Sequence, residues 1–137
     1  VVYAALAAAD EDRARFHLLR SVMHGMGVPA RVRFLQDDES FVICRGHGGG
    51  IECGMHGHAG ANGSRGSPRQ FSRLGRRTNT GHTHSAAIVG DAFVAGTSSL
   101  LRMSYTTGPS SWSHSHIVTY PGGTRTIVTM RDGRWRA

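Results

Sequence analysis

The chain has 137 residues, of which 39% are hydrophobic, 7% are aromatic and 19 are glycines. This length suffices for a single domain with its own core, and the glycine content predicts many tight turns. No apolar run approaches the roughly 18 residues that a membrane span requires. Two cysteines are too few for a disulfide framework. We therefore expect one domain over residues 1–137, no membrane partner and a cytoplasmic location.

The basic charge comes entirely from arginine. All 16 basic residues are Arg, against nine acidic residues, and the formal net charge is +7. Between Cys53 and Gly90 there is no Asp or Glu, so this stretch is electropositive. Because the guanidinium group pairs with phosphate in a bidentate way, a phosphate-bearing partner is one interpretation, and a general bias toward Arg is the other. The Arg residues in this stretch are Arg65, Arg69, Arg73, Arg76 and Arg77.

The first third of the chain predicts a helix and a hairpin. Apolar residues recur at helical spacing over residues 3–26, and Gly25 and Gly27 are placed to end that helix. Residues 31–35 and 40–44 are β-rich runs on either side of a polar turn, which favours a β-hairpin. Residues 45–50 form a glycine-rich loop. The helical segment is thus residues 1–27, and the β-rich part is residues 31–137.

The rest of the chain predicts mostly short strands. Residues 51–55 are an apolar run that ends at His56, and Ser67-Pro68 supplies an N-cap and first-turn proline for a helix to residue 74. Gly90-Asp91 and Pro121-Gly122-Gly123 are typical of hairpin turns. The pattern predicts a mixed α/β (α+β) fold. Further strands are expected at residues 78–84, 86–89, 92–95, 100–105, 114–120 and 124–130, and the aromatic residues Phe93, Tyr105, Trp112 and Trp135 are expected in the core.

Histidine is the residue type that suggests chemistry. Six of the nine histidines form three His-x-His pairs, at 56 and 58, 82 and 84, and 114 and 116. Side chains two apart on a strand share a face, so each pair could reach one ion. Neutral imidazole suits Mn, Zn, Fe and Ni as a ligand. For His114 and His116 an ordinary polar strand pair is the favoured interpretation.

Two of these pairs resemble motifs of the calcineurin-like binuclear metallophosphoesterases. Gly81-His82-Thr83-His84 is similar to the G-H-T-H block of that family, and Met55-His56-Gly57-His58 resembles its H-G-H block. The resemblance extends to residues 96–101 and 105–112, which look like C-terminal strands of phage-type and bacterial members. It implies that the chain corresponds to the C-terminal half of the family's α/β sandwich.

The resemblance also implies roles for individual residues. His56 and His82 would bind one divalent transition metal ion, His84 would bind its neighbour, and His58 would be the catalytic candidate, in the outer sphere or against substrate. The implied activity is hydrolysis of a phosphoester, with a phosphodiester or nucleic acid as substrate. Arg65 and Arg69 are candidate phosphate-binding residues, and Asn62 could orient substrate or simply form an Asn-Gly turn.

The acidic blocks that open the family pattern, Asp-x-His, Gly-Asp-x-x-Asp and Gly-Asn-His-Asp/Glu, do not occur in this sequence. Two cations held close together require anionic ligands, so the resemblance implies a missing N-terminal half or a second chain. The first residue is Val1 and not Met, which favours an upstream segment that was removed or lies in another chain.

Three other interpretations remain open. Cys53-x-x-His56 has the spacing of a structural zinc site. A basic module that binds nucleic acid or phosphate would keep the histidines without turnover, and its binding would depend strongly on salt. A structural or assembly module would use the C-terminal strands as an association surface.

Overall fold

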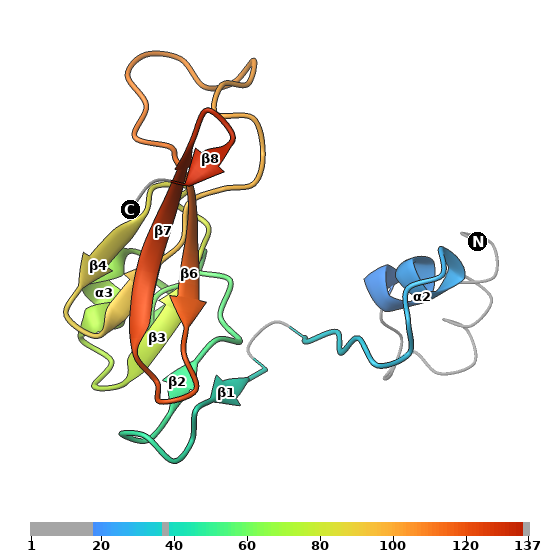
Figure 1. The fold of residues 1–137 in the computed structure, drawn as a ribbon, viewed down its shortest axis with the longest axis vertical. Helices are drawn as coiled ribbons and strands as arrows, with labels where there is room; N and C mark the ends of the chain where they lie inside the picture. The colour runs from blue at the N-terminus through green and yellow to red at the C-terminus, as the bar shows by residue number, and fades with distance from the viewer. Residues whose placement is uncertain (1–17, 37–38, 136–137) are drawn as a thin grey trace. The chain divides into compact units, whose positions relative to one another are not determined.

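The computed structural model describes residues 18–36 and 39–135. These residues fall into two compact units, one within residues 1–36 and one within residues 37–137, and each is described by itself (Figure 1). Helices and two sheets are both present, so the predicted mixed α/β class is confirmed. In the described part of the chain, no helix is both long and apolar enough to cross a membrane.

The first unit contains helix α2 (Leu18–Gly25). Residues 3–17 of the predicted helix lie outside the described residues, but its predicted end is confirmed. Gly27 has a positive φ of 88°, and the Val28 amide donates to the Met23 carbonyl, which closes the helix as a glycine C-cap does. The predicted strand at residues 31–35 is wrong. Val32 lies in a turn, where its amide donates to Pro29, and is 41% exposed.

The second unit is built on a five-stranded sheet in the order β1-β2-β3-β5-β4. Neighbours β2, β3 and β5 are parallel, whereas β1 and β4 pair antiparallel at the two edges. The partner of β1 is β2, across the glycine-rich loop, and this pairing replaces the hairpin predicted with residues 31–35. The strands are β1 (Val42–Ile43), β2 (Ile51–Glu52), β3 (Arg77–Thr80), β4 (Ala87–Val89) and β5 (Ala92–Val94).

Helix α3 (Pro68–Ser72) covers one face of this sheet. It packs against β3, β4 and β5. The predicted start is confirmed, because the Ser67 hydroxyl accepts from the Gln70 amide and Pro68 occupies the first turn. Phe71, which is 1% exposed, is the largest fully buried side chain. The core is small. It also contains Ile51, Ala92 and Val94, together with the buried polar residues Thr78 and Thr80.

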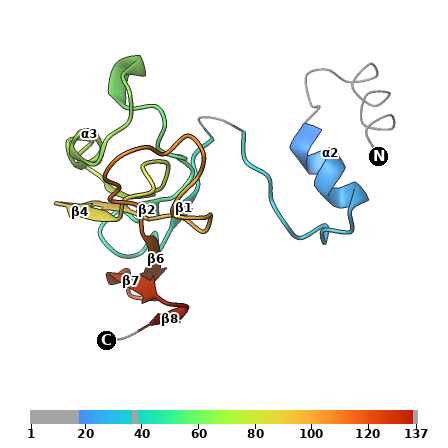
Figure 2. The same cartoon turned by 90° about the horizontal axis from the view of Figure 1, so that it is seen from above.

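A three-stranded antiparallel sheet covers the opposite face. It consists of β6 (His114–Thr119), β7 (Arg125–Arg131) and the short β8 (Arg134–Trp135), which the sequence did not predict. Figure 2 shows α3 and the β6–β7 hairpin on opposite sides of the five-stranded sheet. Both predicted turns are confirmed, since Gly90 links β4 to β5 and Gly123 lies between β6 and β7.

The predicted strand at residues 100–105 is wrong. Residues 95–113 contain no strand. The Met103 amide and carbonyl both bond to the Thr106 hydroxyl, which closes a local turn. Leu100 is 73% exposed, so this β-prone run has no sheet surface on which to pack.

Arg125 attaches the β6–β7 hairpin to the five-stranded sheet. Its guanidinium donates to the Thr78 carbonyl at 2.8 Å and to the Asn79 side chain at 3.1 Å. It also lies 4.0 Å above the centre of the Phe93 ring, a cation–π contact, and pairs with Asp91. Asn79 in turn donates to the Thr119 hydroxyl of β6. The hairpin is therefore held by polar contacts more than by apolar packing.

Glu52 is a buried carboxylate that ties β2 to the segment before β1. It is 3% exposed and accepts hydrogen bonds from the Ser40 hydroxyl, the Phe41 amide and the Gly54 amide. Arg76 lies 3.4 Å away. Burial alone would raise the pKa of Glu52, but these hydrogen bonds and Arg76 outweigh it and lower the pKa below 4.5.

We predict that Glu52→Gln destabilises the second unit at neutral pH by about 1–3 kcal/mol, because its amide group would face donors that need an acceptor. Since the folded-state pKa is lowered, the stabilisation is complete above pH 4.5 and is lost as pH falls below it. Urea unfolding of both forms across this range measures the effect, with the exposed Asp132→Asn as control. A constant difference between wild type and Glu52→Gln down to acidic pH would contradict this account.

Candidate metal centre

The histidines of two motifs meet at the carboxyl edge of the parallel strands. His56 follows β2 and His82 follows β3, and these strands are parallel neighbours. The Gly81 amide donates to the His56 carbonyl at 2.9 Å, which continues the pairing beyond the strand ends. Loops that follow adjacent parallel strands lie at the same edge of the sheet. The chain thus brings together side chains that are 26 residues apart in sequence.

Glycine allows this close approach. Gly57 is buried and has a φ of 111°, and a Cβ atom there would lie 2.9 Å from the Gly81 carbonyl oxygen. Gly66 packs directly against Gly57, since a Cβ atom at position 66 would lie 2.0 Å from the Gly57 carbonyl oxygen and 3.0 Å from the Phe71 ring. The buried Phe71 therefore supports the loop from below, and only glycine fits between the two.

His56, His58 and His82 form a cluster of three imidazole rings. His82 Nδ1 lies 3.3 Å from His56 Nε2. The ring centroids are 5.2 Å apart for His56 and His82, 5.7 Å for His56 and His58, and 6.1 Å for His58 and His82. His56 and His58 are exposed, so the cluster is open to solvent. We call these three residues the histidine cluster.

The G-H-T-H segment has an unusual backbone. His82 has a φ of 70° and His84 a φ of 59°, both in the left-handed region that residues other than glycine rarely adopt. The Thr83 amide donates to the Gly81 carbonyl, which tightens the turn between them. Two strained residues so close together cost free energy, and such strain collects at functional sites. The turn aims the His82 ring at His56.

His84 is placed differently. Its ring contacts Trp112 edge-to-face with centroids 4.2 Å apart, and its backbone carbonyl accepts from the Ser113 amide. Its Nδ1 atom is buried and has no hydrogen-bond partner in the described part of the chain. The structure therefore places the His84 ring against Trp112, whereas its charge still acts on His82. An unpaired buried nitrogen is a candidate ligand atom.

Of the three candidate phosphate-binding residues, Arg65 is the one that lies near the cluster. The loop from His58 to Gly66 folds back on itself, because the Gly66 amide donates to the His58 carbonyl and Ala59 bridges to Arg65. Asn62 has a φ of 56° and precedes Gly63, which fits the Asn-Gly turn interpretation. Arg69 is exposed on α3. In the described part of the chain, neither Asn62 nor Arg69 is hydrogen-bonded to the cluster.

The surroundings of His82 favour its neutral form. Partial burial lowers the pKa of His82, and repulsion between its positive form and neighbouring His56, His58, Arg65 and His84 lowers it further. A neutral ring can offer a lone pair to a cation at neutral pH. Burial instead raises the pKa of the Cys53 thiol, which donates to the Ile51 carbonyl. A zinc ion at Cys53 would have to displace this proton and the hydrogen bond to Ile51.

The histidine cluster fits a metal ion in part. Two imidazole nitrogens bound to one tetrahedral zinc ion at ~2.0–2.1 Å lie about 3.3–3.4 Å apart. The His56–His82 nitrogen separation of 3.3 Å matches this spacing. Among the described residues, however, no group of three His, Cys, Asp or Glu side chains is arranged to hold an ion as it stands. The pair supplies two ligands, and further ligands must move in or come from elsewhere.

The third His-x-His pair behaves as an ordinary strand pair. His114 and His116 lie on β6 on either side of the buried Ser115, and His114 Nε2 lies 2.8 Å from the Ser99 carbonyl oxygen.

Sequence reasoning missed the contact of Trp112 with His84. The sequence carried no signal for it, because residues 95–113 form an irregular loop.

Comparison with known proteins finds a relative in a phage. Protein A1 of Escherichia phage T5 is 43% identical over 137 residues, which is 99% of this chain and 23% of that protein. The chain thus spans about a quarter of the length of this relative. No protein-family profile matches the chain, and no solved structure matches it.

We predict that Gly57→Ala separates the two histidine loops. The added methyl group meets the Gly81 carbonyl oxygen, and the positive φ adds strain, so a loss of about 2–3 kcal/mol in the free energy of unfolding is expected. The imidazole NMR signals of His56 and His82 should shift. Gly63→Ala is the matched control, because Gly63 also has a positive φ but nothing lies within 4 Å. Equal effects of both variants on stability and on these signals would contradict the close-approach argument.

Proposed function

We propose that this chain contributes the histidine half of a divalent-metal centre that hydrolyses phosphoesters, with a phosphodiester such as a nucleic acid as substrate. The observation that carries the proposal is the 3.3 Å approach of His56 Nε2 and His82 Nδ1 at the carboxyl edge of parallel strands. The left-handed turn at His82 and His84 supports it, because it directs the His82 ring toward His56.

The proposal rests on the resemblance of the two histidine motifs to those of metallophosphoesterases. In that interpretation His56 and His82 share one ion of Mn, Zn, Fe or Ni. His84 would bind a neighbouring ion through Nδ1, which has no hydrogen-bond partner among the described residues, and Trp112 fixes the orientation of the ring. When bound, two such ions polarise a phosphoryl oxygen and activate a water molecule.

The residues around the cluster have tasks that follow from their positions. His58 is exposed at the rim of the cluster, where its ring can exchange a proton with a leaving group or a water molecule. Arg65 is held beside His58 by the folded loop, and its guanidinium can pair with a phosphate oxygen. Asn62 and Arg69 lie further out and contribute through long-range charge or loop shape.

The acidic ligands of the centre come from outside the described residues in this proposal. Glu52, the buried acid closest in sequence to His56, is committed to Ser40, two backbone amides and Arg76. A second chain, or another segment of a longer protein, would supply the carboxylates that two cations need. We place the activity in the cytoplasm of the host cell, in keeping with a relative from a phage.

The test is hydrolysis of a chromogenic phosphodiester with Mn²⁺, using the longest natural protein that contains this sequence. We expect His82→Ala to lower turnover by about 100-fold or more, because one ligand of the ion is removed. His116→Ala is the matched control. It removes an exposed histidine from a strand outside the cluster and should leave turnover unchanged. Metal-independent turnover, or equal turnover in His82→Ala and wild type, would overturn the proposal.

A further inference from the structure

The three-stranded sheet has an outward face with exposed side chains, and at the His114 end of this face the residue 95–113 loop approaches through the Ser99 carbonyl. Arg125 and Ser115 point toward the five-stranded sheet, so residues alternating with them along β6 and β7 point away from it. Val118 and Val128 are on this outward side, and Tyr120 continues it beyond the end of β6. Trp135 of β8 pairs with Met130 and extends the face. We call it the outer face.

Large aromatic side chains are exposed on the outer face. Trp135 is 57% exposed, Tyr120 is 50% exposed and Val118 is 37% exposed. The expectation that Trp135 is a core residue is therefore wrong, and the same holds for Tyr105, which is 67% exposed. Trp135 lies at the end of a two-residue strand, where the small core does not reach. An exposed Trp beside an exposed Tyr on one sheet needs an explanation other than packing.

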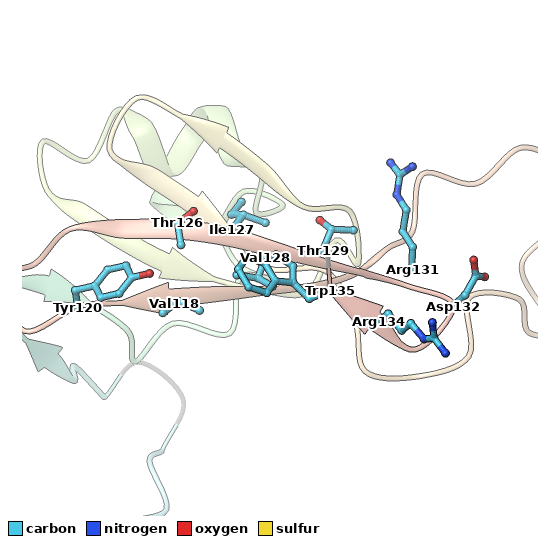
Figure 3. Close-up of a pocket in the computed structure, with 10 residues that line it drawn as sticks. All are labelled: Val118, Tyr120, Thr126, Ile127, Val128, Thr129, Arg131, Asp132, Arg134 and Trp135. Carbon is cyan, nitrogen blue, oxygen red and sulfur yellow. The ribbon is translucent and has the colours of Figure 1, made fainter. Parts of the chain in front are cut away.

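Positive charge lies at one end of the hairpin. Arg131 and Arg134 alternate with Met130 and Trp135 along β7 and β8, so they leave the strands on the side opposite to Trp135. They still line the same pocket as Val118, Tyr120 and Trp135 (Figure 3). Neither guanidinium forms an ion pair with a described residue. Asp132 is the one acid in the lining. In Figure 3 Tyr120 lies toward one end of the face, Trp135 near its middle beside Val128, and the two Arg residues toward the other end.

We infer that the outer face binds single-stranded nucleic acid by stacking bases on Tyr120 and Trp135, with Arg131 and Arg134 pairing with phosphates. Exposed aromatic rings on a sheet, flanked by Arg, form the usual stacking platform for unpaired bases. The formal charge of +7 favours a polyanion. This inference does not depend on the proposed hydrolase activity.

The spacing on the face suits a strand of several nucleotides. Tyr120 pairs with Thr124, and Trp135 pairs with Met130. These two rungs of the hairpin are separated by six residues of β7, or ~20 Å at about 3.3 Å per residue. The backbone positions of Tyr120 and Trp135 are thus too far apart for one base to stack on both rings. A strand lying along β7 would bring different bases to Tyr120 and Trp135 and its phosphates to the Arg end.

The chemistry of the face separates single strands from other partners. Bases in a duplex are already stacked on one another, so a duplex can use the Arg end but not the aromatic rings. A protein partner would bury Val118 and Val128 but would not require two guanidinium groups at the rim that have no ion pair with a described residue. Charge and aromatic exposure together therefore favour nucleic acid over a second protein.

The test is fluorescence anisotropy with a labelled single-stranded oligonucleotide of roughly a dozen nucleotides and with the matching duplex. We expect the single strand to bind more tightly. Trp135→Ala and Tyr120→Ala should each weaken its binding by about 5- to 150-fold, whereas Trp135→Phe should retain most of it. Arg134→Gln should lower the slope of log affinity against log salt by about one. Tyr105→Ala is the aromatic control, because Tyr105 is exposed outside this face.

Two outcomes would overturn the inference. Equal binding of single strand and duplex, unchanged by Trp135→Ala, would show that the charge alone attracts nucleic acid. Absence of binding, together with a concentration-dependent dimer that Trp135→Ala dissociates, would assign the outer face to a second copy of the chain. Thermal unfolding of each variant shows that it is folded. Neither outcome bears on the histidine cluster, so the proposed hydrolase can stand or fall separately.

Discussion

The hydrogen bond from the Gly81 amide to the His56 carbonyl is the contact on which the candidate site depends. It extends the parallel pairing of β2 and β3 beyond the strand ends, and it holds the two histidine loops at backbone contact distance. Gly57 makes this possible because it has a positive φ and no side chain. Each loop alone would present scattered exposed histidines, whereas together they bring two ring nitrogens to the spacing of ligands on one ion.

The rest of the second unit supports this edge with few apolar residues. Phe71 anchors α3 on one side of the sheet, and Arg125 attaches the β6–β7 hairpin on the other side through hydrogen bonds and the Phe93 ring. Because the core is small, several aromatic side chains lie outside it. Trp112 packs on His84, and Trp135 remains exposed on the outer face. Trp112 orients the ring of a candidate metal ligand, and Trp135 belongs to the face that we propose for base stacking.

Local signals made much of this fold predictable. The Ser67-Pro68 helix start, the turns at Gly90 and Gly123, and most C-terminal strands each depend on residues that are neighbours in sequence, and these predictions are confirmed. Strands predicted at residues 31–35 and 100–105 are wrong, because β propensity produces a strand only where a partner edge is available. Strand propensity alone does not identify that edge.

For the site, the sequence predicted which histidines to consider but not their arrangement. Motif order suggested that His56 and His82 meet, and the parallel register of β2 and β3 brings them together. The contact of the His84 ring with Trp112 depends on a loop without periodic pattern, so no local rule could have predicted it. Arg65 lies near the cluster because its loop closes through Gly60 and Gly66, whereas Arg69 is carried away on α3.

The central claim is that His56 and His82 share one metal ion. The most direct measurement is a titration of the chain with Zn²⁺, followed by ¹H–¹⁵N NMR of the histidine imidazole nitrogens. The account predicts that His56 Nε2 and His82 Nδ1 shift together and saturate at the same equivalent, while the ring nitrogens of His114 and His116 stay unchanged. Independent shifts of the two nitrogens, or first saturation at His114 and His116, would contradict it.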